Sequence, residues 1–167
     1  KTSEYFDPKI KTAISALEFN FMSQLPIAGR RLLDIGAGAG LFAALASEHG
    51  WSVTALDPAL DQEVLVGRPN ITAIRGTADD LPINEQFDVV TMWDVIEHVT
   101  TPVKAIIDAR SRIKDGGWLV IETGNYRSAD RVLGGASHWI FQLDHRWYFS
   151  PESMSHILAR LGFSDFV

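Results

Sequence analysis

The chain has 167 residues, of which 46% are hydrophobic and 22% charged, so we predict one globular domain spanning residues 1–167. Its formal net charge is −6 and it has no dense cluster of Lys and Arg, which argues against a nucleic-acid partner. It has no cysteine, which excludes disulfides and thiolate metal sites, and no apolar run that could span a membrane, so a cytoplasmic location is the default expectation.

The N-terminal segment, residues 1–29, is predicted to be helical, with Pro26 and Gly29 closing the helix. The first residue is Lys1 rather than Met, so we expect the sequence to begin inside a longer chain. One apolar stripe recurs along the segment at helical spacing: Ile10, Ile14, Leu17 and Phe21.

Short apolar runs that follow are predicted to be strands, and helical patterns separate them. This alternation is typical of an α/β fold with a mostly parallel sheet and helices on both faces. The runs show little polar alternation, as expected when both faces of a sheet are covered. The predicted strands are Arg31–Ile35, Ser52–Leu56, Ile71–Ile74, Phe87–Met92 and Trp118–Thr123.

Three helices are predicted after the first strand. The last has a clear start, in which Ser150 is the N-cap, Pro151 the first helical residue and Glu152 an acid in the first turn, and Gly162 ends it. Their apolar stripes are Leu41, Phe42, Leu45 and Ala46, then Val103, Ile106, Ile107 and Ile113, and finally Met154, Ile157, Leu158 and Leu161.

The stretch "LLDIGAGAG" joins the first strand to its helix through three glycines. Such a loop lets a ligand approach the backbone, and the unpaired N–H groups of the helix start point at it. The spacing does not fit the G-x-G-x-x-G pattern of dinucleotide sites, because the last glycine would fall on Leu41 or Ala43. Asp34, two residues before Gly36, suits a ligand with a cationic amine better than a pyrophosphate.

Four motifs then occur in the order found in the class I S-adenosylmethionine-dependent methyltransferases, which the chain resembles over nearly its whole length. They are "LLDIGAGAG", "VTALDP", "GTADDLP" and "FDVVTMWDVIEHV", followed by "IKDGGWLVIET". The stretches "DVIEHV" and "HRWYFSPESM" resemble the small-molecule branch that includes quinone-pathway O-methyltransferases. The resemblance implies a Rossmann-like, doubly wound sheet and S-adenosylmethionine as the cofactor.

The resemblance also implies roles for single residues. Asp57 would accept hydrogen bonds from both ribose hydroxyls, although a helix cap before Pro58 is the alternative. Asp79 would meet the adenine amino group, although it and Asp80 also fit a solvated turn. The predicted cofactor-binding residues are Asp34, Gly36, Ala37, Gly38, Gly40, Asp57, Pro58, Ala78, Asp79, Met92 and Trp93.

Two histidines are the predicted catalytic residues. His98 follows the fourth strand, where the resemblance places the transferred methyl group, and a histidine suits a general base for a hydroxyl nucleophile. His145 resembles the histidine that faces the substrate cavity in the family. A structural role is the alternative for both, and Asp94 and Glu97 fit caps of a short helix. The spacing of histidines and carboxylates indicates no metal site.

Residues 124–150 are long for a connection and are predicted to form a lid over the substrate. The segment is rich in aromatic residues, which either line a substrate cavity or pack as core beneath a helix. They are Tyr126, Trp139, Phe141, Trp147, Tyr148 and Phe149.

We predict a methyltransferase that uses S-adenosylmethionine and acts on a small-molecule acceptor, at oxygen. The alternatives are a domain that binds the cofactor without catalysis and a nicotinamide-dependent oxidoreductase. The sequence ends at "GFSDFV", before the C-terminal strand hairpin of the family, so that hairpin is expected to be incomplete. A homodimer is a further expectation. The sequence does not identify the acceptor.

Overall fold

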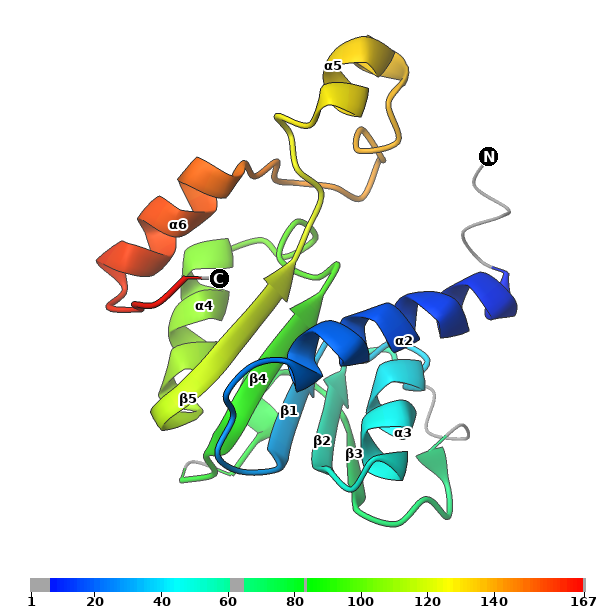
Figure 1. The fold of residues 1–167 in the computed structure, drawn as a ribbon, viewed down its shortest axis with the longest axis vertical. Coiled ribbons are helices and arrows are strands. Elements are labelled where there is room, and N and C mark those ends of the chain that lie inside the picture. The colour runs from blue at the N-terminus through cyan, green and yellow to red at the C-terminus, as the bar shows by residue number, and fades with distance from the viewer. Residues whose placement is uncertain (1–6, 61–64, 83, 167) are drawn as a thin grey trace.

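A computed structural model describes residues 7–60, 65–82 and 84–166. Its centre is a sheet in which every pairing is parallel, with the strand order β3-β2-β1-β4-β5 (Figure 1). The strands are β1 (Arg31–Ile35), β2 (Ser52–Asp57), β3 (Ile71–Arg75), β4 (Phe87–Trp93) and β5 (Ile113–Glu122). The predicted α/β fold with a parallel sheet is therefore confirmed.

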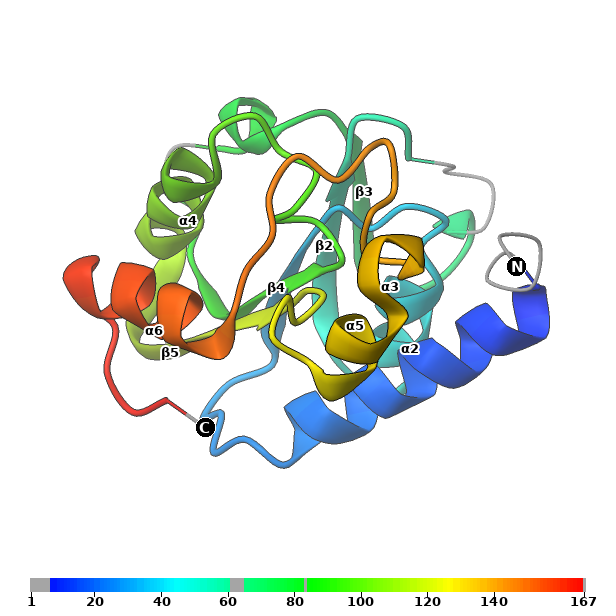
Figure 2. The same ribbon diagram turned by 90° about the horizontal axis from the view of Figure 1, so that it is seen from above.

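Helices cover both faces of this sheet (Figures 1 and 2). One apolar core lies under α2 (Pro8–Ser23) and α3 (Leu41–Glu48). A second lies under α4 (Pro102–Ser111) and α6 (Pro151–Arg160). Between them, residues 124–150 carry α5 (Ala129–Gly134) and stand above the carboxyl ends of the strands (Figure 1).

Strand order reverses between β1 and β4, which are neighbours although β2 and β3 lie between them in the chain. In parallel α/β sheets, ligands bind at such a switch point, outside the carboxyl ends of the strands. The glycine loop after β1 and the polar stretch after β4 both begin at this edge. The topology therefore brings the predicted cofactor and catalytic residues to one side of the molecule.

The helix predicted in the N-terminal segment is present, but its apolar stripe is mostly not the buried face. Leu17 and Phe21 are exposed, whereas Ser15 and Met22 are buried and Met22 belongs to the core under α3. The N-terminal helix begins at Asp7, whose side chain accepts the N–H of Lys9, as expected for an N-cap.

The apolar stripe predicted for the helix before β5 is also wrong in part. Val103 and Ile107 are about half exposed, and only Ile106 of this stripe is fully buried. Ile113 lies in β5, which begins five residues earlier than predicted, before a register shift between Phe87 and Val89 of β4. The last helix matches its prediction, since Ser150 accepts the N–H of Ser153 and Gly162 ends the helix with a φ of 84°.

Candidate active site

The loop after β1 holds three glycines with positive φ, and a side chain would meet different surroundings at each of them. A Cβ at Gly36 would lie 2.2 Å from Val95, and one at Gly40 would lie 2.8 Å from Leu65. At Gly38 the nearest atom would be the carbonyl oxygen of Gly36, 4.0 Å away. Packing inside the protein therefore requires two of the glycines, while Gly38 borders open space that a ligand can fill.

The substitution Gly38→Ala is therefore expected to weaken cofactor binding more than it lowers stability. Gly50→Ala is the matched control, because Gly50 also has a positive φ (82° against 52°) and open space at its Cβ, but lies at the end of α3 away from the loop. Both variants should lose about 1 kcal/mol of stability from backbone strain. Calorimetric titration should show weaker cofactor binding for Gly38→Ala alone, and equal affinities would contradict this assignment.

Asp57 ends β2 and faces the glycine loop. Its carboxylate accepts the N–H of Gly38 at 3.0 Å and the N–H of Ala59 at 2.6 Å. The bond from Ala59 is the local cap that was the alternative role for Asp57, and the bond from Gly38 ties β2 to the glycine loop. A carboxylate has about four acceptor positions, so two remain for the hydroxyls of a ribose. The capping role and the predicted ribose role are therefore compatible.

The two acids after β3, Asp79 and Asp80, differ in their surroundings. Asp80 accepts the N–H of Thr77 at 2.8 Å in a capping box, so its carboxylate stabilises the 3₁₀ turn Ala78–Asp80. Asp79 is exposed, and no hydrogen bond to its side chain is described. Asp79, rather than Asp80, is therefore the acid whose carboxylate is available to a ligand.

The end of β4 approaches the same loop. The side chain of Met92 is buried in the core, so only its backbone is available to a ligand. Trp93 packs edge-on against Phe42 of α3, with 5.2 Å between ring centroids. Its indole Nε1 is buried and has no hydrogen-bond partner. A buried N–H without a partner is rare, and it marks a place where a polar ligand atom fits.

Asp34 lies inside the sheet rather than on the surface of the loop. Only 1% of the residue is exposed, and Oδ1 accepts a hydrogen bond from the Thr91 hydroxyl at 2.8 Å. Burial, together with the charge of Asp57, raises the pKa of Asp34 to about 7 despite the bond from Thr91. A cation close to Asp34 would favour its ionised form.

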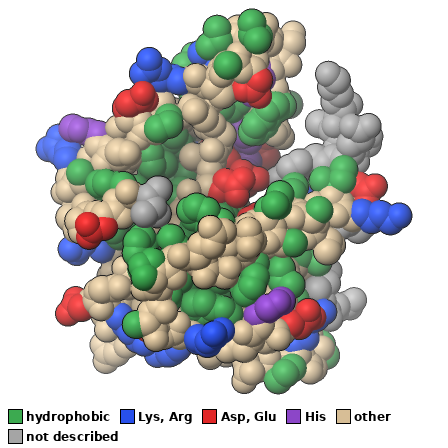
Figure 3. Space-filling model, in the orientation of Figure 1, with side chains coloured by type: hydrophobic (Ala, Val, Ile, Leu, Met, Phe, Trp, Pro, Cys, Tyr) green, Lys and Arg blue, Asp and Glu red, His purple; other side chains and the backbone are tan. Residues whose placement is uncertain are grey.

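Further acids near this edge of the sheet were not predicted as site residues. Burial raises the pKa of Glu18 on α2 to about 8, and the charges of Glu122, Asp34 and Asp94 add to the effect. Acidic side chains gather on this face above α2 (Figure 3). The sequence could not indicate Glu18, because it lies in a separate helix that only the fold brings to the site.

The Glu18 carboxyl predicts a pH dependence of stability. Its pKa is about 8 in the folded state against an ordinary value of 4.5, so the folded state keeps a proton that the unfolded state loses. Stability contributed by this group is therefore present below pH 4.5 and is lost as the pH rises to about 8. Glu18→Gln should reduce the fall in melting temperature between pH 5 and pH 8. The exposed acid Glu48 supplies the control Glu48→Gln, and parallel curves for wild type and Glu18→Gln would contradict the prediction.

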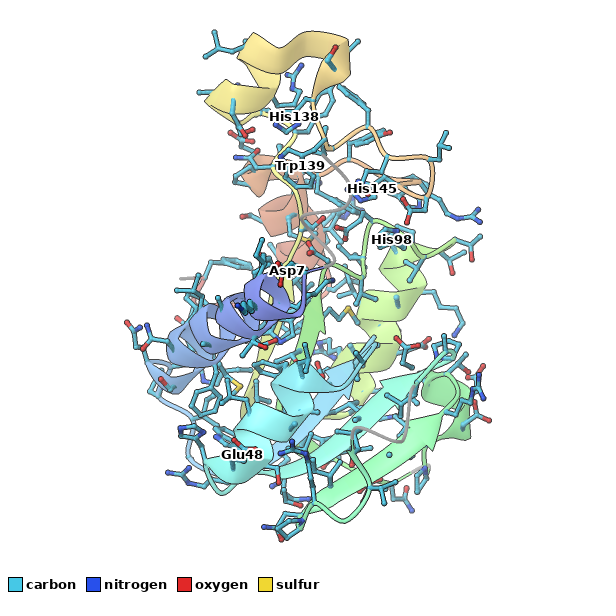
Figure 4. The ribbon with its side chains drawn as sticks, turned by 90° about the vertical axis from the view of Figure 1, so that its right-hand side faces the viewer. Asp7, Glu48, His98, His138, Trp139 and His145 are labelled. Carbon is cyan, nitrogen blue, oxygen red and sulfur yellow. The ribbon has the colours of Figure 1, made fainter. Side chains whose placement is uncertain are left out.

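His98, His145 and Glu97 meet beside the end of β4. Figure 4 shows the two histidines close to each other. One nitrogen of each histidine and one carboxylate oxygen of Glu97 lie within 4.8 Å of one another. His98 Nδ1 lies 3.2 Å from the carbonyl oxygen of Asp144, so Nδ1 carries the proton and Nε2 keeps a free lone pair. The two predicted catalytic histidines are thus neighbours, with 4.8 Å between ring centroids.

Residues 124–150 connect to this cluster through the backbone. The N–H groups of Arg146 and Trp147 donate to the carbonyl oxygen of Glu97 at 2.8 and 3.2 Å. A cavity of about 640 Å³ opens at the junction, and its lining is His98, Leu143, Asp144 and Arg146. A small acceptor placed there would lie directly beside His98.

The aromatic side chains of residues 124–150 are mostly not core. Phe149 is buried in the core under α6, but the other five are 38–55% exposed: Tyr126, Trp139, Phe141, Trp147 and Tyr148. The core alternative is therefore wrong for these five residues. One of these rings, Trp139, lies edge-on against His145, with 6.4 Å between ring centroids. Exposed rings near the histidines suit a flat or apolar acceptor, which they would shield from water.

Comparison with known proteins agrees with these motifs. A family model described as "Methyltransferase domain" matches residues 9–165. The chain is 33% identical over 152 residues to the ubiquinone biosynthesis O-methyltransferase of Roseobacter denitrificans, covering 82% of the chain and 61% of that protein. It is 31% identical over 164 residues to the enzyme of the same name from Cereibacter sphaeroides, covering 88% and 66%. The chain thus spans less than two thirds of these relatives.

Solved structures have the same architecture. A "SAM-dependent methyltransferase, possible histamine N-methyltransferase" from Thermotoga maritima is 25% identical, with a TM-score of 0.68, over 91% of this chain and 71% of that one. A SAM-dependent methyltransferase from Archaeoglobus fulgidus, at 23% identity and a TM-score of 0.73 over 92% and 69%, shares the fold. Among the described residues, no helix is both long and apolar enough to cross a membrane.

The order of the four motifs, the parallel sheet with its glycine loop at the switch point, and the match over residues 9–165 lead to one conclusion. The chain belongs to the class I S-adenosylmethionine-dependent methyltransferase family.

Proposed function

We propose that this chain transfers a methyl group from S-adenosylmethionine to an oxygen of a small-molecule acceptor. The observation that carries the proposal is the cradle formed by Gly38 and Asp57. Gly38 borders open space, and the Asp57 carboxylate keeps two acceptor positions beside it. Relatives at 31–33% identity are O-methyltransferases by name, which supports oxygen as the acceptor atom.

The residues at this edge fit the cofactor. Asp57 would hold the ribose, Asp79 the adenine amino group, and the unpartnered Nε1 of Trp93 an oxygen of the ligand. Gly36, Ala37, Gly38 and Gly40 would supply the backbone of the cradle, with Pro58 and Ala78 beside the nucleoside and Met92 along the amino-acid tail. The positive charge of that tail would favour the ionised forms of Asp34 and Glu18, whose pKa values are raised without the cofactor, and the ionised carboxylates would then offset it. When bound, the cofactor supplies a methyl group already activated by its sulfonium.

The protein contributes alignment and proton handling. The acceptor hydroxyl must point at the methyl group from the side opposite the sulfur, at about 3 Å. The cavity lined by His98, Leu143, Asp144 and Arg146 is open to solvent, which gives the acceptor a way in. His98 is held by the Asp144 carbonyl with a free Nε2, which suits it to act on the hydroxyl proton. Residues 124–150, with their exposed rings, would cover the acceptor and exclude water.

The substitution Asp57→Asn is expected to weaken cofactor binding roughly tenfold to a hundredfold, or by about 1.5–3 kcal/mol. Asparagine has a single acceptor oxygen, so it keeps only one of the two backbone bonds and loses an acceptor for the ribose diol. Calorimetric titration measures the change. Asp79→Asn gives a comparison at the adenine end. A loss below twofold for Asp57→Asn would mean that Asp57 serves only the loop and the Ala59 cap.

The alternatives predict different ligands or no turnover. An oxidoreductase would need a nicotinamide dinucleotide, but the glycine spacing does not fit one. A domain that binds the cofactor without catalysis would release no methyl group to any acceptor. A methyl-release assay across phenols, catechols, carboxylic acids and amines tests the proposal. Formation of a methyl ether from a hydroxylated acceptor would support it, and transfer only to amines would contradict the oxygen assignment.

Three expectations from the sequence remain proposals. They are the single domain over residues 1–167, a homodimer and a cytoplasmic location. Limited proteolysis, sedimentation and cell fractionation, respectively, would test them.

A further inference from the structure

Four carboxyl groups from four different segments lie close together on the side of the sheet that α2 covers. Glu18 lies on α2, Asp34 on β1, Asp94 directly after β4 and Glu122 at the end of β5. The charges of the other three all act on the Glu18 carboxyl group. Acidic side chains above α2 are visible in Figure 3. We call these four residues the acidic cluster.

The alternation of side chains along the strands explains why two of these acids face α2. Leu32 of β1 and Val120 of β5 belong to the core under α2 and α3, and a side chain two positions further along a strand points to the same side. Asp34 and Glu122 therefore also face α2, at the carboxyl ends of their strands. This is the end of the sheet at which the glycine loop begins.

The packing of α2 directs Glu18 toward these acids. Ser15, one turn earlier on the helix, is 8% exposed, and its side chain hydrogen-bonds to the Glu18 carboxyl group. Met22, one turn later, is fully buried, so this side of the helix faces the sheet. Partial burial and the neighbouring acids raise the pKa of Glu18 to about 8. At neutral pH the carboxyl group therefore keeps its proton.

The same face of the sheet carries a hydrogen-bond donor without a partner. The indole Nε1 of Trp93 is buried and unpartnered, and the ring packs against the core under α2 and α3. This N–H suits the carboxylate of an amino-acid tail, whereas acids beside it suit an ammonium or a sulfonium group. Gly38 borders open space at the same edge of the sheet. The face therefore fits a zwitterionic ligand that carries an additional positive charge.

We propose that Glu18 is a specificity-determining residue that, together with Asp34 and Glu122, favours S-adenosylmethionine over its demethylated product, S-adenosylhomocysteine. The two molecules share the nucleoside and the amino-acid tail, but only S-adenosylmethionine carries a sulfonium charge. A positive charge near the acidic cluster favours the carboxylate form of Glu18, so its O–H bond breaks and the proton passes to the buffer. The product has a neutral sulfur, so it gains less from the cluster and leaves more readily.

Proton release couples the affinity for the cofactor to pH. Binding that releases one proton strengthens about tenfold for each unit by which the pH rises. The affinity for S-adenosylmethionine should therefore increase between pH 6 and pH 7.5, and that for S-adenosylhomocysteine should increase less. This range lies below the ordinary pKa of an α-amino group, about 7.7–8.0, so the amine of either ligand stays charged. The inference rests on the cofactor site of the proposed function, but needs neither an acceptor nor turnover.

Calorimetric titration at pH 7 in two buffers of different ionisation enthalpy counts the protons released. We expect S-adenosylmethionine to release more than S-adenosylhomocysteine in the wild type, and the difference to shrink in Glu18→Gln, whose side chain cannot ionise. The ratio of the two affinities should also fall at least about threefold in Glu18→Gln. Glu48→Gln is the matched control, because Glu48 pairs with Arg68 at the far end of α3 and should behave as the wild type.

Glu122→Gln supplies a second variant, in which the Glu18 carboxyl group remains but loses a neighbouring charge that raises its pKa. Fewer protons should therefore be released than in the wild type, and circular dichroism verifies that each variant is folded. Equal proton release by the two ligands in the wild type, or an unchanged affinity ratio in Glu18→Gln, would overturn the role of Glu18 and leave the proposed function standing. Failure of the wild type to bind S-adenosylmethionine would overturn both.

Discussion

Replacing His98 with alanine is expected to lower the rate of methyl transfer about 10²–10⁴-fold, the usual contribution of a positioned group that handles a proton. His98 lines the cavity that the proposed function assigns to the acceptor, and its free Nε2 is directed by the bond from Nδ1 to the Asp144 carbonyl. Cofactor affinity should hardly change, because the cradle is formed by other residues. Steady-state kinetics at saturating cofactor measure the rate, and calorimetry measures the affinity.

The exposed His156 supplies the control, since His156→Ala should keep wild-type activity. Treatment of the protein with a chelator distinguishes two roles of His98, general base and metal ligand. A general base would give a rate that survives removal of metal ions by a chelator. A metal ligand would give a rate that is lost on chelation and returns when a divalent cation is added. A stable His98→Ala variant with nearly full activity would remove His98 from the mechanism.

The substitution Met22→Ala is expected to lower the free energy of unfolding by about 2–5 kcal/mol, the range for truncating a large buried side chain. Met22 is fully buried and anchors α2 to the core under α3. Its neighbour Phe21 is 46% exposed, so Phe21→Ala should cost no more than about 0.5–1 kcal/mol. Urea denaturation of both variants measures the difference. A larger loss for Phe21→Ala would mean that Phe21, and not Met22, carries the packing of α2.

The strands and the glycine loop could be predicted because their signals are local. Each strand is a short apolar run between polar segments, and three alternating glycines after such a run need no distant contact to be recognised. Four of the predicted strands agree with the structure to within one residue. β5 begins earlier because the pairing of Ile113 with Phe87, across an irregular stretch in which Gly116 has a φ of 74°, depends on the neighbouring strand.

The buried face of α2 could not be predicted, because the helix has apolar residues on more than one side. Leu17 and Phe21 share helical spacing, but so do Ser15 and Met22. Only packing against α3 decides between them, and it selects the second pair. Periodicity identifies a helix more reliably than it identifies the face that is buried.

In the candidate site, too, features with local sequence signals could be predicted, and features set by contacts between distant segments could not. Gly38 and Asp57 could be predicted because each directly follows a strand of a parallel sheet. The meeting of His145 with Glu97 and His98 could not be predicted, because the two segments are far apart in the sequence. His98 and Asp144, which Nδ1 of His98 contacts, are 46 positions apart. Glu18 reaches the acidic edge only because α2 packs beside it. Contacts between distant segments therefore account for the residues that the sequence did not indicate.

The central claim is that the cradle around Gly38 and Asp57 binds S-adenosylmethionine. Calorimetric titration of the chain with S-adenosylmethionine, and separately with NADH, tests it most directly. We expect saturable binding of one S-adenosylmethionine per chain, weakened in Asp57→Asn, and no saturable binding of NADH. Saturable binding of NADH with none of S-adenosylmethionine would contradict the account.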